Sequence, residues 1–94
     1  MSLPTPASKK LIDEKKKLVT DAVEDFNCSH KRKLVLIKEE PFPHANEAII
    51  GMTYSYNGRE LIFVGCRTLP CFVIEQTSDG TTKEFMDEFL ETLD

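Results

Sequence analysis

The dipeptide Asn57-Gly58 constrains the fold of this chain more than any other feature of the sequence. It separates two segments rich in β-branched, aromatic and aliphatic residues, 47–56 and 59–66. Asn and Gly both tolerate the positive φ angles of a type I′ turn, and the twist of that turn suits a two-residue hairpin loop. The sequence therefore predicts an antiparallel hairpin over residues 47–66.

A two-residue loop also fixes the register of the hairpin. The expected pairs are Tyr56 with Arg59, Tyr54 with Leu61, Met52 with Phe63 and Ile50 with Gly65. One face of the hairpin then carries Ile50, Met52, Tyr54, Leu61 and Phe63. We expect this apolar face to be the core side, with Ile62 and Val64 as apolar exceptions on the other face.

Amphipathic patterns predict a helix at each end of the chain. In the first helix Thr5 can cap, Pro6 suits the first helical position, and the apolar stripe continues to Phe26. At 100° per residue, the apolar side chains fall within roughly 140°. The second helix begins with Thr81 to Glu84, which matches a capping box. Both stripes must pack on an apolar surface, which the hairpin offers.

Lys15 interrupts the apolar stripe of the first helix. A lysine in such a position commonly lays its methylene groups on the core and carries its ammonium group to the surface. The functional alternative is a buried lysine whose pKa is lowered. We expect the structural role for this side chain.

Two further strands complete the expected sheet. Residues 34–37 are four consecutive apolar residues without alternation, a pattern typical of a strand that is covered on both faces or central in a sheet. Residues 39–46 contain Pro41 and Pro43, which cannot continue a paired strand, so we expect a loop there. Residues 71–76 predict the fourth strand.

These elements predict an α+β fold with two layers, in the order α-β-β-β-β-α. An antiparallel four-stranded sheet carries an N-terminal and a C-terminal helix. A chain of 94 residues suffices for one core, so residues 1–94 are expected to form a single domain, with 1–5 as a flexible leader. No segment is apolar enough to span a membrane or to act as a secretory signal, which favours a cytoplasmic protein without membrane contact.

Cysteine and histidine residues are the first candidates for chemistry, but their spacing matches no zinc motif. Nucleophilic catalysis would require Cys66 or Cys71 to lie beside His44. We expect no catalytic residue, no metal and no cofactor, and we expect that the protein is not an enzyme. A ligand-binding or catalytic pocket near His44, Cys66 and Cys71 stays open as an alternative hypothesis.

The charges are divided unevenly along the chain. Residues 1–38 hold nine Lys or Arg against five Asp or Glu, whereas residues 39–94 hold three against eleven. Lys31, Arg32 and Lys33 form a candidate anion-binding site for phosphate or nucleic acid, which is a further alternative. The net charge of −4 opposes binding of nucleic acid.

The candidate interface consists of Tyr54, Tyr56, Arg59, Ile62 and Val64. Aromatic residues and Arg are enriched in interface hot spots. Tyr54 can equally pack beneath a helix, and Arg59 can stack on Tyr56 across the hairpin. If both helices cover one face of the sheet, Ile62 and Val64 leave an apolar patch on the other. We therefore expect a non-enzymatic interaction or assembly domain whose partner is another protein chain, with self-association into a homodimer through a sheet face or edge.

Overall fold

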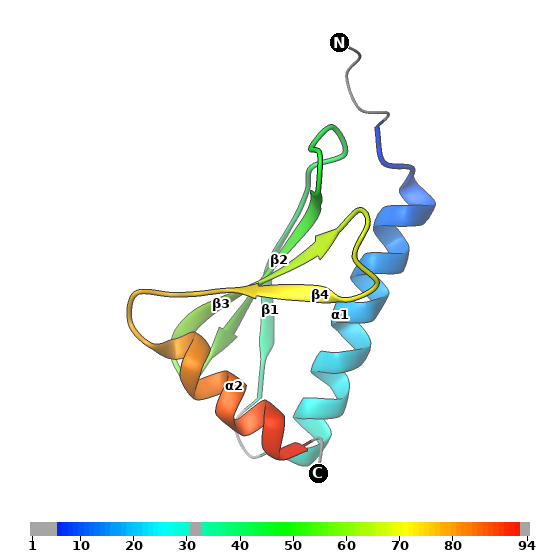
Figure 1. Ribbon diagram of the computed structural model, residues 1–94. Helices are drawn as coiled ribbons and strands as arrows, with labels where there is room; N and C mark the ends of the chain where they lie inside the picture. Colours follow the sequence, from blue (N-terminus) through cyan, green and yellow to red (C-terminus); the bar gives the residue numbers. More distant parts are fainter. Residues whose placement is uncertain (1–5, 31–32, 93–94) are drawn as a thin grey trace.

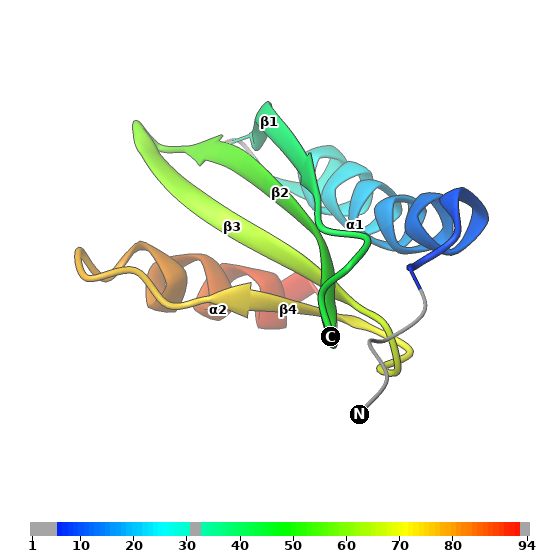
Figure 2. The same cartoon turned by 90° about the horizontal axis from the view of Figure 1, so that it is seen from above.

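The computed structural model describes residues 6–30 and 33–92 and has the element order α-β-β-β-β-α (Figure 1). The elements are α1 (Lys9–Ser29), β1 (Val35–Pro41), β2 (Ala48–Tyr56), β3 (Arg59–Cys66), β4 (Phe72–Glu75) and α2 (Thr81–Thr92). The strands form one antiparallel sheet in the order β1-β2-β3-β4, which Figure 2 shows from above. The predicted α+β class and element order are therefore confirmed. Neither helix of the described residues is long and apolar enough to cross a membrane.

Strands β2 and β3 form the predicted hairpin. Asn57 and Gly58 have φ angles of 53° and 78°, as a type I′ turn requires. All four residue pairs expected from the sequence are present. At the far end of the hairpin the register shifts between Ala48 and Ile50, an irregularity that the sequence did not indicate.

Both helices cover the same face of the sheet, and an aromatic cluster joins the two layers. The Phe26 ring of α1 lies 4.9 Å from the Phe85 ring of α2 and 6.0 Å from the Tyr56 ring of β2. Phe85 in turn lies 5.6 Å from Phe63 of β3. The C-terminal half of α1 therefore lies beside α2 (Figure 1). All four rings are almost completely buried, so this cluster is the centre of the core.

Strand β1 differs from the prediction in its place and in its extent. It is an edge strand whose seven residues are all exposed, not a strand that is central or covered on both faces. In the segment 34–37 only Leu34, which precedes the strand, is buried. Strand order depends on the connections between strands, and here each strand lies beside its neighbour in sequence. The first strand is therefore an edge, whatever its own apolar pattern.

The same strand continues through residues that the sequence assigned to a loop. Pro41 is paired with Ile50. Proline has no backbone N–H group to donate, and a strand at the edge of a sheet tolerates this absence. Between Leu36 and Lys38 the register shifts, which makes Ile37 an extra residue in a β-bulge. The loop predicted over residues 39–46 was therefore wrong for residues 39–41 and correct for residues 42–46, because the strand ends at Pro41.

The helix starts also differ from the sequence prediction. Ser8 is the N-cap of α1, and its hydroxyl oxygen accepts a hydrogen bond of 3.1 Å from the Leu11 N–H. The predicted cap Thr5 lies outside the described residues. In α2, Thr81 is the first helical residue and not the cap. Asp79 Oδ1 accepts the Thr81 N–H at 2.9 Å and also the Thr81 hydroxyl, so this carboxylate replaces the expected capping box.

Lys15 lays its stem on the core as predicted, but the residue is buried and its ammonium group binds a backbone carbonyl. The residue is only 9% exposed, and Nζ donates a hydrogen bond of 2.8 Å to the Leu69 carbonyl oxygen. Its stem lies over Gly65 of β3, where an added Cβ would come within 2.7 Å of the Lys15 Cβ. Gly65 thus allows α1 to approach the sheet closely.

Candidate interaction surface

The face of the sheet that the helices leave uncovered, called the outer face below, has an apolar centre. Gly51, Val64 and Val73 are paired in one row across β2, β3 and β4. The Phe42 ring lies over Gly51, where an added Cβ would be 3.4 Å from its Cε2 atom. Phe42 and Val73 are 42% and 44% exposed. Glu40 of β1 completes this row, so the exposed apolar side chains are Val73 at its β4 end and Phe42 over Gly51.

A second row crosses the outer face beside the first. The register aligns Lys38 of β1, Thr53 of β2, Ile62 of β3 and Glu75 of β4. This row is positive at the β1 edge, uncharged in the middle and negative at the β4 edge. Within its own strand, Lys38 Nζ lies 3.8 Å from Glu40 Oε2, and both side chains are more than half exposed.

The outer face is hollowed and not flat. A depression of about 200 Å³ is lined by residues of all four strands and of the β1–β2 loop. Its lining consists of Lys38, Glu40, Phe42, Ala48, Gly51, Thr53, Ile62, Val64 and Glu75. A side chain from another molecule could therefore sit against the apolar centre.

The structure divides the predicted interface residues between two faces. Ile62 and Val64 lie on the outer face and are partly exposed. Arg59 is exposed at the hairpin tip, where its guanidinium donates a hydrogen bond of 3.1 Å to the Asp79 carbonyl oxygen. Tyr54 and Tyr56 are buried on the helix-covered face, as in the alternative that packs Tyr54 beneath a helix. These two tyrosines therefore belong to the core and not to the surface proposed below.

The free edges of the sheet are less suited to pairing with another chain. The first part of β1 exposes Val35, Leu36 and Ile37. The bulge, the charged side chains that follow it and Pro41 are all features that discourage pairing at a sheet edge. At the other edge, β4 has only four residues. The outer face is therefore a better candidate than either edge.

The residues proposed for a catalytic pocket have different environments. Cys66 is buried, whereas Cys71 and His44 are exposed. Burial raises the pKa of the Cys66 thiol, and the negative charge of Glu47 raises it further. A raised pKa keeps the Cys66 sulfur protonated, whereas a nucleophilic cysteine needs a lowered pKa. Among the described residues, no group of three His, Cys, Asp or Glu side chains could hold a metal ion.

An apolar groove of about 520 Å³ runs between β4 and α2. It is lined by Cys71, Phe72, Ile74, Gln76, Thr82, Met86 and Phe89. Neither His44 nor Cys66 lines it, so this groove does not bring the three residues of the catalytic alternative together.

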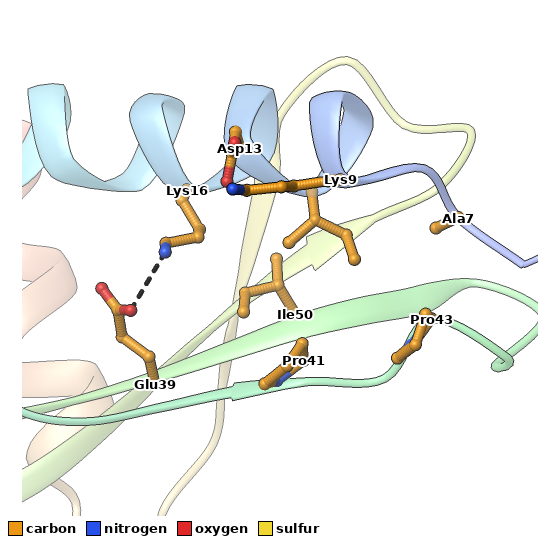
Figure 3. A pocket seen from close by; sticks show the side chains of 9 residues that line it. Ala7, Lys9, Asp13, Lys16, Glu39, Pro41, Pro43 and Ile50 are labelled. Atoms are coloured by element: carbon orange, nitrogen blue, oxygen red, sulfur yellow. Dashed lines mark ion pairs between the residues drawn. The ribbon is translucent and has the colours of Figure 1, made fainter.

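A further cavity of about 420 Å³ lies between the first turns of α1 and the end of β1 (Figure 3). Pro41, Pro43 and Ile50 form its apolar wall, and Lys16 Nζ lies 3.1 Å from Glu39 Oε2 at one end. Its four charged lining residues are two lysines and two acids, so the charges balance. The lining comes from three separate segments, which is why no sequence motif indicated it.

The predicted anion-binding cluster lies largely outside the described residues. Lys31 and Arg32 belong to the undescribed part, and Lys33 is exposed beside it. Binding of phosphate or nucleic acid at this cluster therefore stays a prediction.

Sequence reasoning found part of the outer face and missed the rest. Ile62 and Val64 were identified because they break the alternation of the hairpin. Phe42 was missed because the prolines beside it indicated a loop. Val73 was missed because its position on the outer face depends on the pairing of β4 with β3.

Comparison with protein-family models, curated proteins and solved structures finds no match to this chain. The function is therefore inferred from the geometry of the molecule itself. Among the described surfaces, the outer face combines exposed apolar side chains with an ordered charge pattern, and it supports the proposal below.

Proposed function

We propose that this protein is a non-enzymatic interaction domain that self-associates by packing the outer faces of two copies together. The exposed apolar centre formed by Phe42, Val64 and Val73 is the observation that carries the proposal. An antiparallel sheet with one covered face commonly has polar residues on the other. Burying this apolar row against a second copy would remove it from water, which is favourable.

The size of the outer face supports a weak and reversible dimer. With strands about 4.8 Å apart and about 3.3 Å per residue, the face measures roughly 15 by 20 Å. This is smaller than the roughly 800 Å² per partner of a standard interface. We therefore expect a dissociation constant in the micromolar range or weaker.

The location that fits this proposal is the cytoplasm. All three cysteines are free, and two of them, Cys28 and Cys71, are exposed. Exposed free thiols persist in a reducing compartment and tend to be oxidised outside it. Fractionation of cells that produce the tagged full-length chain tests this inference, and recovery from an oxidising compartment would contradict it.

Sedimentation of the full chain over a wide concentration range tests the self-association. The mass should rise from 10.7 kDa toward twice that value as the concentration increases. Replacing two paired outer-face residues, Val64→Thr with Val73→Thr, should weaken association by about tenfold or more, because the apolar surface becomes polar at equal shape. Thr preserves the β-branched shape that suits a strand, so the fold should persist.

The matched control removes an exposed aliphatic residue from the helical layer. Leu90 of α2 is 53% exposed, and Leu90→Gln should leave the sedimentation profile unchanged. A wild-type chain that stays at 10.7 kDa at roughly millimolar concentration would refute the proposal. Equal weakening by the control and by the Val64/Val73 variant would also refute it.

A further inference from the structure

The outer face carries opposite charges at the two ends of one row. Lys38 lies at the β1 edge, Glu75 lies at the β4 edge, and Thr53 and Ile62 lie between them. Lys38 already has Glu40 as an ion-pair partner in its own strand, at 3.8 Å. Within residues 6–30 and 33–92, the Glu75 carboxylate has no ion-pair partner. The β4 edge of the row therefore offers an uncompensated negative charge.

We propose that two copies pack their outer faces about a two-fold axis parallel to the strands, with Lys38 of each copy opposite Glu75 of the other. The proposal rests on the proposed self-association and adds its orientation. A rotation about such an axis exchanges the β1 and β4 edges, so the positive end of one row meets the negative end of the other. Two identical ion pairs then flank the apolar centre.

The middle of the row fits the same orientation. The rotation sets Thr53 of one copy against Ile62 of the other, and in the neighbouring row it sets Gly51 against Val64. Small residues of β2 thus face larger apolar residues of β3, so the surfaces can interdigitate. The strands of the two sheets run in nearly the same direction, as in aligned sheet packing.

A two-fold axis across the strands is the main competing orientation. It would set Lys38 of one copy against Glu40 of the other, but these two residues are already paired within each chain. It would leave both Glu75 carboxylates without an ion-pair partner and over Val73 of the opposite copy. The axis parallel to the strands instead sets Glu40 over Val73, and Glu40 keeps Lys38 of its own strand as a partner. The axis parallel to the strands compensates one more charge in each copy, and we favour it for this reason.

A charge swap measured by sedimentation distinguishes the orientations. Lys38→Glu and Glu75→Lys should each weaken the dimer by about tenfold, because each change converts two attractive contacts into two repulsive ones. The double variant has the net charge of the wild type and restores opposite charges across the interface. Its dissociation constant should return to within about threefold of the wild-type value.

Matched charge reversals on α1 serve as controls. Lys10→Glu and Glu14→Lys make the same charge changes at exposed positions of the helical layer and should leave association unchanged. Circular dichroism of each variant checks that the fold is retained.

The outcomes separate this inference from the function on which it rests. One outcome is that the Val64/Val73 variant dissociates while the double charge variant binds no more tightly than the single charge variants. In that case the outer face is the interface, but the proposed orientation is wrong. Restoration by Lys38→Glu with Glu40→Lys instead would establish the axis across the strands. If the wild type does not associate at any concentration, the proposed function itself fails.

Discussion

Gly65 lies where α1 approaches the sheet closely. A methyl group added there would come within 2.6 Å of Ile50 Cγ2 and 2.7 Å of Lys15 Cβ. Lys15 Cβ is fixed by the helix backbone, so the helix must shift. We predict that Gly65→Ala lowers the free energy of unfolding by about 1–3 kcal/mol, as measured by urea denaturation.

Gly51 provides the matched control on the opposite face. There an added Cβ would meet Phe42 Cε2 at 3.4 Å, an ordinary contact. Gly51→Ala should be neutral or slightly stabilising, because Ala also reduces the freedom of the unfolded chain. Equal losses of stability in the two variants would show that close approach of α1 is not the reason for Gly65.

Asp79 connects the start of α2 to the acid stability of the protein. Hydrogen bonds from Thr81, with a further bond from Thr77, lower the pKa of its carboxyl group from 3.8 to about 2. Because the pKa is lower in the folded state, this carboxylate contributes fully to the free energy of unfolding above about pH 4. The contribution is lost as the pH falls toward 2. Wild type should therefore lose more stability than Asp79→Asn between these pH values, in urea titrations at each pH.

The comparison has a control because Glu91 is exposed in α2, the helix that follows Asp79. Glu91→Gln removes a carboxylate from α2 without removing the bonds to Asp79, and it is the reference variant in the same titrations. If Asp79→Asn runs parallel to the wild type, the carboxylate has the same pKa in the folded and unfolded states. The proposed cap would then be wrong.

At the scale of elements, one side chain of α1 binds the residue that precedes β1. Asn27 Oδ1 accepts the Leu34 N–H at 2.8 Å, and Asn27 Nδ2 donates to the Leu34 carbonyl oxygen at 3.0 Å. The amide thus replaces a strand partner for this residue. Asn27→Ala should destabilise the protein by about 1–2 kcal/mol and speed hydrogen exchange at the Leu34 amide.

The neighbouring position Cys28 is exposed and separates this bond from a general effect on the helix. Cys28→Ala should leave exchange at the Leu34 amide unchanged. Similar exchange rates in Asn27→Ala and the wild type would mean that the two hydrogen bonds do not hold the start of β1.

The elements were predictable where local chemistry decides their geometry. The Asn57-Gly58 turn set the register of β2 and β3 correctly because a two-residue loop permits one pairing. The place of β1 was predicted wrongly, since an unbroken apolar run does not determine the number of neighbouring strands. The predicted helix starts were wrong, because Ser8 caps α1 and Asp79 accepts the Thr81 N–H at the start of α2, and the sequence offers other residues of the same type nearby.

The candidate surface was only partly predictable for a related reason. Ile62 and Val64 break the hairpin alternation and were therefore visible in the sequence. The charge order from Lys38 to Glu75 depends on the registers of all three strand pairs, and the bulge in β1 changes one of them. Such a pattern exists only once the whole sheet is assembled.

At the scale of the whole molecule, self-association should be coupled to stability. A dimer that forms only from folded chains stabilises them by mass action. The thermal midpoint of the wild type should therefore rise with protein concentration, whereas that of the Val64/Val73 variant should change much less. Calorimetry at several concentrations measures this effect, and equal concentration dependence in both proteins would contradict it.

The order of strands in the sheet also determines how the chain can acquire its structure. Each strand pairs with the one before it through a short connection, at 42–47, 57–58 and 67–71. Assembly can therefore proceed strand by strand, with a small entropic cost of loop closure at each step. The aromatic cluster is different, because Phe85 comes from the last helix. During synthesis, Tyr56 and Phe63 stay without this partner until residues 81–92 have left the ribosome, so the core closes last.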